Sequence, residues 1–92
     1  LWLCARRGER LEALASELER RWPGAGRPRA RVQALDVRDL AALRAFIEFA
    51  DADSGGLDAI VANAGVGRAE HAARLEWAAI EEVLAVNVLG AF

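Results

Sequence analysis

The stretch at residues 60–67, IVANAGVG, carries the main sequence signal for the fold. Its apolar start belongs to a run over residues 57–62 that predicts a buried strand, where a polar side chain is normally unwelcome. Asn63 nevertheless stands where this strand opens into a turn with Gly65 and Gly67. In open parallel sheets, ligands gather beyond the carboxyl ends of the strands. A polar residue at this position therefore favours a strand that leads into a ligand site.

The rest of the chain alternates between expected strands and helices in units of about thirty residues, the size of a strand-helix-strand unit. Short apolar or alternating runs predict two further strands, over residues 1–5 and 31–37. Apolar positions three or four apart predict a helix over residues 6–22, a second capped by Asp39, and a third from about Glu76 onward. This order predicts the α/β class, with three parallel strands and three helices that cover the sheet.

Several conspicuous side chains are expected to be structural. The three tryptophans are expected to lie in the core or to pack between helices: Trp2, Trp22 and Trp77. Glu81 and Glu82 are expected to form a solvated helix face. Glycine, proline and serine are expected to end the first two helices: Pro23, Gly24, Gly26 and Pro28 after the first, and Ser54, Gly55 and Gly56 after the second.

The composition suits a soluble globular segment, and 92 residues allow at most one domain. No apolar run approaches the roughly 20 residues that span a bilayer, so no membrane helix is predicted. The 12 basic and 14 acidic residues are mixed along the chain, which gives nucleic-acid binding little support. The single cysteine, Cys4, cannot form an internal disulfide, which fits a cytoplasmic location. His71 has no second histidine or cysteine nearby, so no metal site is expected.

Polar residues follow all three expected strands. Arg6 and Arg7 follow the first, Asp36 and Val37 end the second, and Asn63 follows the third. Any one of these could be an ordinary turn between a strand and a helix. Three together at the same edge of a parallel sheet favour a ligand groove.

Four segments in order, ARRGERLEAL, ALDVRD, VANAG and VNVLGAF, resemble the classical short-chain dehydrogenase/reductase family. The resemblance covers essentially all 92 residues, in the family's order and spacing. It implies a Rossmann-like doubly wound parallel sheet and a domain truncated at both ends, from the second strand to the helix after the fourth. The family's glycine-rich turn, its catalytic serine and its Tyr-xxx-Lys pair are expected outside residues 1–92. The 92-residue piece alone is therefore expected to be inactive.

The resemblance also implies roles for residues around an adenosine. Arg6, with Arg7 behind it, would bind the 2′-phosphate of NADP, because guanidinium groups make strong hydrogen bonds to phosphate. Asp36 would accept a hydrogen bond from the adenine amino group, while Val37 packs on the ring. Ala64 and Gly65 would keep bulk away from the adenosine. The alternatives left open are that Arg6 and Arg7 are solvated charges at a helix start, and that Asp36 merely ends its strand.

Two asparagines complete the implied site. Asn63 would hold neighbouring backbone and line the cofactor channel, since its amide both donates and accepts hydrogen bonds. Asn87 would belong to the catalytic tetrad and order a water that leads to the active-site lysine, and Val86 beside it would lie in the cofactor-binding set. The alternative for Asn87, which falls on the apolar helix face of Ile80 and Val88, is a buried amide satisfied by backbone.

Two classes of function follow. The first is an NADP-dependent oxidoreductase that transfers hydride between the nicotinamide and a small carbonyl or alcohol substrate, a homo-oligomer as the full-length protein. The second is a catalytically silent protein of the same fold that senses the nucleotide or scaffolds a partner.

Overall fold

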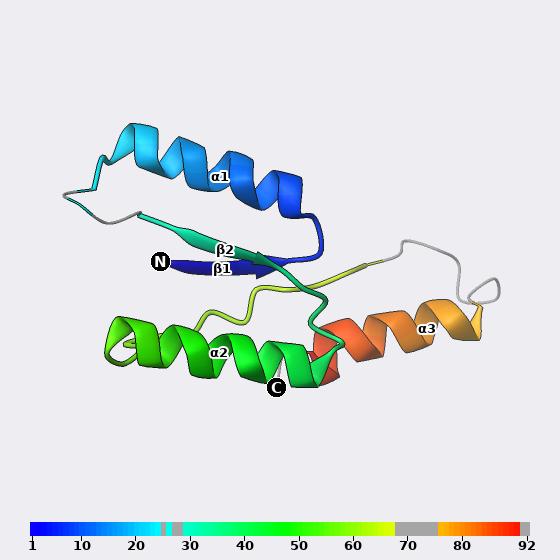
Figure 1. Ribbon diagram of the computed structural model, residues 1–92. Coiled ribbons are helices and arrows are strands. Elements are labelled where there is room, and N and C mark those ends of the chain that lie inside the picture. The colour runs from blue at the N-terminus through cyan, green and yellow to red at the C-terminus, as the bar shows by residue number, and fades with distance from the viewer. Residues whose placement is uncertain (25, 27–28, 68–75, 91–92) are drawn as a thin grey trace.

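A computed structural model describes residues 1–24, 26, 29–67 and 76–90 (Figure 1). His71 and the part of the expected loop beyond Gly67 lie outside the described residues. The elements follow one another along the chain as strand β1 (Trp2–Ala5), helix α1 (Gly8–Arg21), strand β2 (Arg31–Ala34), helix α2 (Leu40–Ser54), helix α3 (Trp77–Leu84) and the π-helical turn η2 (Ala85–Leu89). No helix among the described residues is both long and apolar enough to cross a membrane.

The two strands form a parallel sheet, in a register that pairs Trp2 with Arg31 and Ala5 with Ala34. Helix α1 lies on one side of the strands and α2 on the other (Figure 1). Helices on both faces of a parallel sheet define the doubly wound α/β arrangement, so the predicted fold class is confirmed.

Local sequence signals set the bounds of α2. The Asp39 side chain caps the helix by accepting a hydrogen bond from the backbone N–H of Ala42 at 3.0 Å. Gly55 ends it in the left-handed conformation, with φ of 75°, which glycine adopts without a steric penalty. The predicted cap and the predicted stop are both confirmed.

An aromatic cluster joins the sheet to α2. The Trp2 ring contacts Phe46 and Phe49 edge to face, with ring centroids 6.0 and 5.5 Å apart. Phe46 is buried, while the Arg31 guanidinium lies 5.2 Å from the Trp2 ring centroid and pairs with Asp53 at 3.0 Å. Trp2 therefore packs against a helix as predicted, and the cluster fixes α2 under β1.

The expected strand over residues 57–62 is wrong for this structure. The sheet of the described residues has two strands, and residues 57–62 have no regular secondary structure. Ile60 and Val61 are 66% and 83% exposed. A strand exists through hydrogen bonds to a neighbour, and none of the described residues forms a ladder with this segment. An apolar run without such a neighbour stays extended but unpaired.

Two of the three tryptophans are not packed as predicted. Trp22 lies just after the last residue of α1 and is 56% exposed, and Trp77 at the start of α3 is 78% exposed. The apolar positions of α3 and η2 share this exposure, since Leu84 and Val88 are 52% and 46% exposed. The predicted stripe is therefore not the buried face of this segment: the buried residues are Ala79 and Val86, at 7% and 4% exposure.

The end of η2 packs closely against the loop after β2. Gly90 is buried and its N–H donates to the Ala85 carbonyl at 2.8 Å. A Cβ added to Gly90 would lie 2.7 Å from Val37 Cγ2 and 3.0 Å from the Val37 and Val86 carbonyl oxygens. The residue that follows η2 must therefore be glycine for the helix end to approach the loop after β2.

We predict that Gly90→Ala destabilises the full-length protein by about 1–3 kcal/mol, because the added methyl overpacks against backbone that cannot rotate away. The backbone φ of −76° is ordinary, so the effect is purely steric. Urea unfolding measures it, and Gly67→Ala is the matched control, because a Cβ there meets nothing within 4 Å. Equal stability of the two variants would contradict the contact.

Candidate functional site

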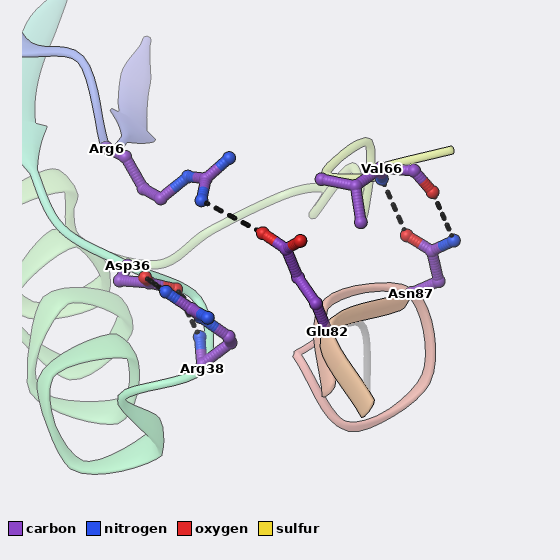
Figure 2. A network of polar contacts seen from close by, with 6 residues as sticks. All are labelled: Arg6, Asp36, Arg38, Val66, Glu82 and Asn87. Atoms are coloured by element: carbon purple, nitrogen blue, oxygen red, sulfur yellow. Dashed lines mark hydrogen bonds and ion pairs between the residues drawn. The ribbon is translucent and has the colours of Figure 1, made fainter. Parts of the chain in front are cut away.

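The carboxyl ends of β1 and β2 lie at one edge of the sheet, because the strands are parallel and end in register at Ala5 and Ala34. The Leu35 N–H donates to the Ala5 carbonyl at 3.0 Å and extends the pairing by one residue. Arg6 follows β1 and Asp36 follows this last pair, so the edge gathers the two side chains that the sequence assigned to it. Figure 2 shows Arg6 on the segment after β1 and Asp36 on the turn after β2.

Asp36 is held by Arg38, two residues further on. Its Oδ1 accepts from the Arg38 backbone N–H and from Nε, both at 3.0 Å, and its Oδ2 accepts from Nε at 3.0 Å and from Nη2 at 2.5 Å. The hydrogen bond from the Arg38 side chain, then that from its backbone N–H, and more weakly the charge of Arg6, lower the pKa of the Asp36 carboxyl to about 2. Asp36 is therefore an ionised acceptor with a fixed orientation at neutral pH.

Arg6 reaches a different element. Its Nη1 lies 3.7 Å from Oε1 of Glu82 on α3, and its side chain is 51% exposed (Figure 2). The interpretation of Glu82 as part of a solvated face is therefore wrong, since its side chain is only 27% exposed and its carboxylate faces Arg6. The Glu82 charge also raises the pKa of Arg38, after the larger effect of Asp36. Two arginines and two carboxylates thus form one charge cluster: Arg6, Asp36, Arg38 and Glu82.

Arg7 behaves differently from Arg6. It is the residue before α1, its carbonyl accepts from the N–H groups of Arg10 and Leu11, and its exposed side chain has no partner among the described residues. This geometry agrees with the alternative of a solvated charge at a helix start. Only Arg6 of the pair is engaged across the edge.

Asn87 ties the loop after the expected third strand to the C-terminal helix. Its Oδ1 accepts from the Val66 N–H and its Nδ2 donates to the Val66 carbonyl, each at 2.8 Å (Figure 2). The amide thus satisfies both backbone groups of one residue, as a strand neighbour would. The alternative of a buried amide is wrong about burial: Asn87 is exposed, within the π-helical turn η2, while its neighbour Val86 is buried at 4% exposure. The other half of that alternative is correct, because the Val66 backbone satisfies the amide.

The same loop contains three more predicted site residues, all exposed: Asn63, Ala64 and Gly65. The Asn63 N–H donates to the Val61 carbonyl at 3.0 Å, but its side chain has no hydrogen bond among the described residues. Among the described residues, a side-chain tie of the kind predicted for Asn63 is made by Asn87. Gly65 lies close to that tie, because a Cβ there would be 3.5 Å from Asn87 Oδ1.

Three residues that sequence reasoning did not assign to the site belong to it. Arg38 orients Asp36, Glu82 pairs with Arg6, and Gly90 lets η2 approach Val37. Arg38 and Gly90 stand inside the quoted segments ALDVRD and VNVLGAF, so their position was a usable signal. The sequence carried no such signal for Glu82, because its partner lies on a distant element. In the part of the chain that the structure describes, no group of three or more histidine, cysteine or carboxylate side chains could hold a metal ion.

The comparisons with known proteins agree with the fold. The profile of a family described as short chain dehydrogenase matches residues 1–92. An uncharacterized oxidoreductase of Myxococcus xanthus (strain DK1622) is 41% identical over 99% of this chain. Uncharacterized oxidoreductases of Mycobacterium tuberculosis, from strains CDC 1551 / Oshkosh and ATCC 25618 / H37Rv, are each 41% identical over 74% of it. The chain therefore belongs to the short chain dehydrogenase family.

A solved structure supports the same assignment. The apo structure of a short chain oxidoreductase from Pseudomonas aeruginosa PAO1, described as containing an atypical catalytic center, matches 97% of this chain with a TM-score of 0.84 and 37% identity. The chain spans 33% of that protein, 38% of the Myxococcus relative and 26% of the Mycobacterium relatives. The resemblance read from the sequence is thus confirmed, together with the Rossmann-type fold of the family.

We predict that Asp36 makes the protein lose stability in acid. Its folded pKa of about 2 lies below the value of roughly 3.9 for an unfolded chain, so its contribution is complete only above about pH 5 and is lost as pH falls through 4 toward 2. In Asp36→Asn the free energy of unfolding should fall less steeply between pH 5 and pH 3 than in the wild type (roughly the upper part of this window). Asp58→Asn, at an exposed site without a hydrogen bond among the described residues, is the control. Parallel slopes for all three proteins would refute the assignment.

Proposed function

We propose that the chain is the inner part of a single NAD(P)-binding Rossmann domain, truncated at both ends, from an NADP-dependent oxidoreductase. The full-length protein would transfer hydride between the nicotinamide and a carbonyl or alcohol carbon of a small molecule. Family membership supports the oxidoreductase class. The observation that carries the choice of NADP is the half-exposed Arg6 guanidinium just beyond β1. A cytoplasmic location and a homo-oligomeric state belong to the same proposal.

The residues at the sheet edge fit an adenosine 2′-phosphate. A phosphate needs a cationic donor, and Arg6 offers a planar set of N–H groups with no hydrogen bond among the described residues. An adenine amino group needs an acceptor, and Asp36 is an ionised carboxylate at this edge. Arg38 donates to both of its oxygens, so the adenine amino group would share these oxygens with Arg38. Val37 beside it supplies an apolar surface for the ring. Ala5, at the end of β1, offers no carboxylate that would bind a ribose diol or repel a phosphate.

The remaining site residues would shape the cofactor channel rather than contact the adenosine. When bound, the nicotinamide supplies the hydride chemistry, and the protein supplies binding and orientation. Asn87 holds Val66 with one donor and one acceptor, which leaves its second amide proton and a second lone pair for a water. We assign Asn63, Ala64 and Gly65 to the wall of the cofactor channel, with Val86 and Arg7 as more remote members of the cofactor-binding set.

One observation favours keeping the second candidate function, a catalytically silent nucleotide sensor or scaffold. The Pseudomonas neighbour is described as containing an atypical catalytic center, so the usual serine and Tyr-xxx-Lys set is not assumed for this protein. Turnover of NADPH with a panel of carbonyl compounds separates the two functions. NADPH binding without turnover of any of them would support the sensor.

We predict that Arg6→Ala in the full-length protein weakens NADPH binding roughly ten- to a hundredfold, the value of a charge-assisted hydrogen bond of about 1.5–3 kcal/mol. NADH binding should stay nearly constant, because NADH has no 2′-phosphate. Dissociation constants for both cofactors at fixed ionic strength measure the effect, with Arg10→Ala as control, since Arg10 is exposed on α1 and its side chain has no partner among the described residues. Equal losses for the two cofactors, or no loss, would overturn the NADP assignment.

We predict that Asn87→Ala lowers the turnover number at least roughly tenfold, as removal of a proton-relay group does, and changes the NADPH dissociation constant much less. The reason is that the amide holds a loop and a water rather than the cofactor itself. Steady-state kinetics and direct binding measure the two effects separately. Gln33→Ala removes an exposed amide on β2 and serves as control. A variant that keeps its turnover number but loses NADPH affinity would show the role to be wrong.

A further inference from the structure

We propose that Glu82 is a specificity-determining residue for the cofactor. Its carboxylate competes with the 2′-phosphate of NADP for the Arg6 guanidinium, and so narrows the preference for NADP over NAD. This inference rests on the function proposed above, in which Arg6 binds that phosphate.

The geometry of the pair is that of a loose counterion. Arg6 comes from the turn after β1 and Glu82 from α3, and their closest charged atoms, Nη1 and Oε1, are 3.7 Å apart (Figure 2). Charge-assisted hydrogen bonds between such groups are shorter, at about 2.7–2.9 Å, and an arginine fixed by a carboxylate usually makes two of them. A single contact at this distance attracts the guanidinium without fixing its plane. Arg6 can therefore turn toward a better anion.

The other carboxylate of the cluster is already neutralised. Asp36 accepts three kinds of hydrogen bond from Arg38, from the backbone N–H, Nε and Nη2, so this pair is satisfied locally. Glu82 is the carboxylate that faces Arg6 at close range, and its side chain is only 27% exposed. Partial enclosure reduces screening by water, which strengthens the effect of its charge on a neighbouring anion.

The two cofactors differ in how they meet this charge. A 2′-phosphate that approaches Arg6 brings negative charge toward Glu82, and like charges repel. The ribose of NAD carries a neutral diol at the same position, which a carboxylate does not repel. Glu82 therefore disfavours NADP selectively. The expected change in NADPH affinity is that of an ion pair near the surface.

A positioning role for Glu82 would change NADPH affinity in the opposite direction. If Glu82 oriented Arg6 for the phosphate, removal of its charge would weaken NADPH binding. The long single contact argues against orientation, because a guanidinium is positioned by two parallel hydrogen bonds to a carboxylate.

The test uses Glu82→Gln in the full-length protein, with Glu81→Gln as the matched control. Glu81 is the adjacent residue, exposed on the same helix, and its side chain has no partner among the described residues, so both variants lose the same charge. Dissociation constants for NADPH and NADH are measured at low and high salt. In Glu82→Gln we expect NADPH to bind roughly two- to fivefold tighter, the range of a surface ion pair, with NADH and the control unchanged. High salt should reduce the gain.

A double variant separates this inference from the proposed function. In an Arg6→Ala background, Glu82→Gln should no longer change NADPH affinity, because the two act on one guanidinium. A gain that persists there, equal responses of the Glu82 and Glu81 variants, or weaker NADPH binding in Glu82→Gln would overturn the role of Glu82 and leave Arg6 assigned to the phosphate. If Arg6→Ala alone leaves NADPH binding intact, the proposed function fails, and the inference fails with it.

Discussion

The parallel pairing of β1 with β2 is the constraint on which the rest of the structure depends. The strands run in the same direction and end together, so the residues that follow them emerge at one edge. Two helices then cover opposite faces of the sheet, and α2 is fixed to it by the Trp2 cluster (Figure 1). An antiparallel pair would have placed Arg6 and Asp36 at opposite ends. The direction of the strands thus determines where the candidate site lies, and the side chains determine its chemistry.

The C-terminal helix is attached to this edge by contacts of three different kinds. Glu82 attracts Arg6, the Asn87 amide pairs with the Val66 backbone, and Gly90 seats against the loop after β2. The predicted apolar stripe of α3 is largely exposed, whereas Ala79 of α3 and Val86 of η2 are buried, so among the described residues these edge contacts and two small apolar side chains hold the helix in place. Because those contacts involve the residues assigned to the cofactor, the position of α3 and the shape of the site are linked.

Sequence reasoning succeeded where the cause is local and failed where the cause lies on a distant element. The Asp39 cap and the Gly55 stop depend on neighbours within a few residues, and the parallel sheet follows from the spacing of its elements. Residues 57–62 have the composition of a strand, but pairing requires a neighbour that their own sequence does not specify. The same holds for Glu82, whose pairing with Arg6 depends on how α3 is placed.

The two arginines at the edge differ in how readily an incoming anion can recruit them. Arg38 makes several hydrogen bonds to Asp36, which raise its pKa and would have to be broken before it could serve a phosphate. Arg6 has one contact at 3.7 Å and a half-exposed side chain, so its exchange from Glu82 to a phosphate loses far less interaction. The edge therefore combines a fixed acceptor, Asp36, with an adaptable donor, Arg6. In the proposed function, such a site would orient the adenine by rigid geometry and select at the ribose by competition between charges, so the cofactor preference could be tuned without changing the fold.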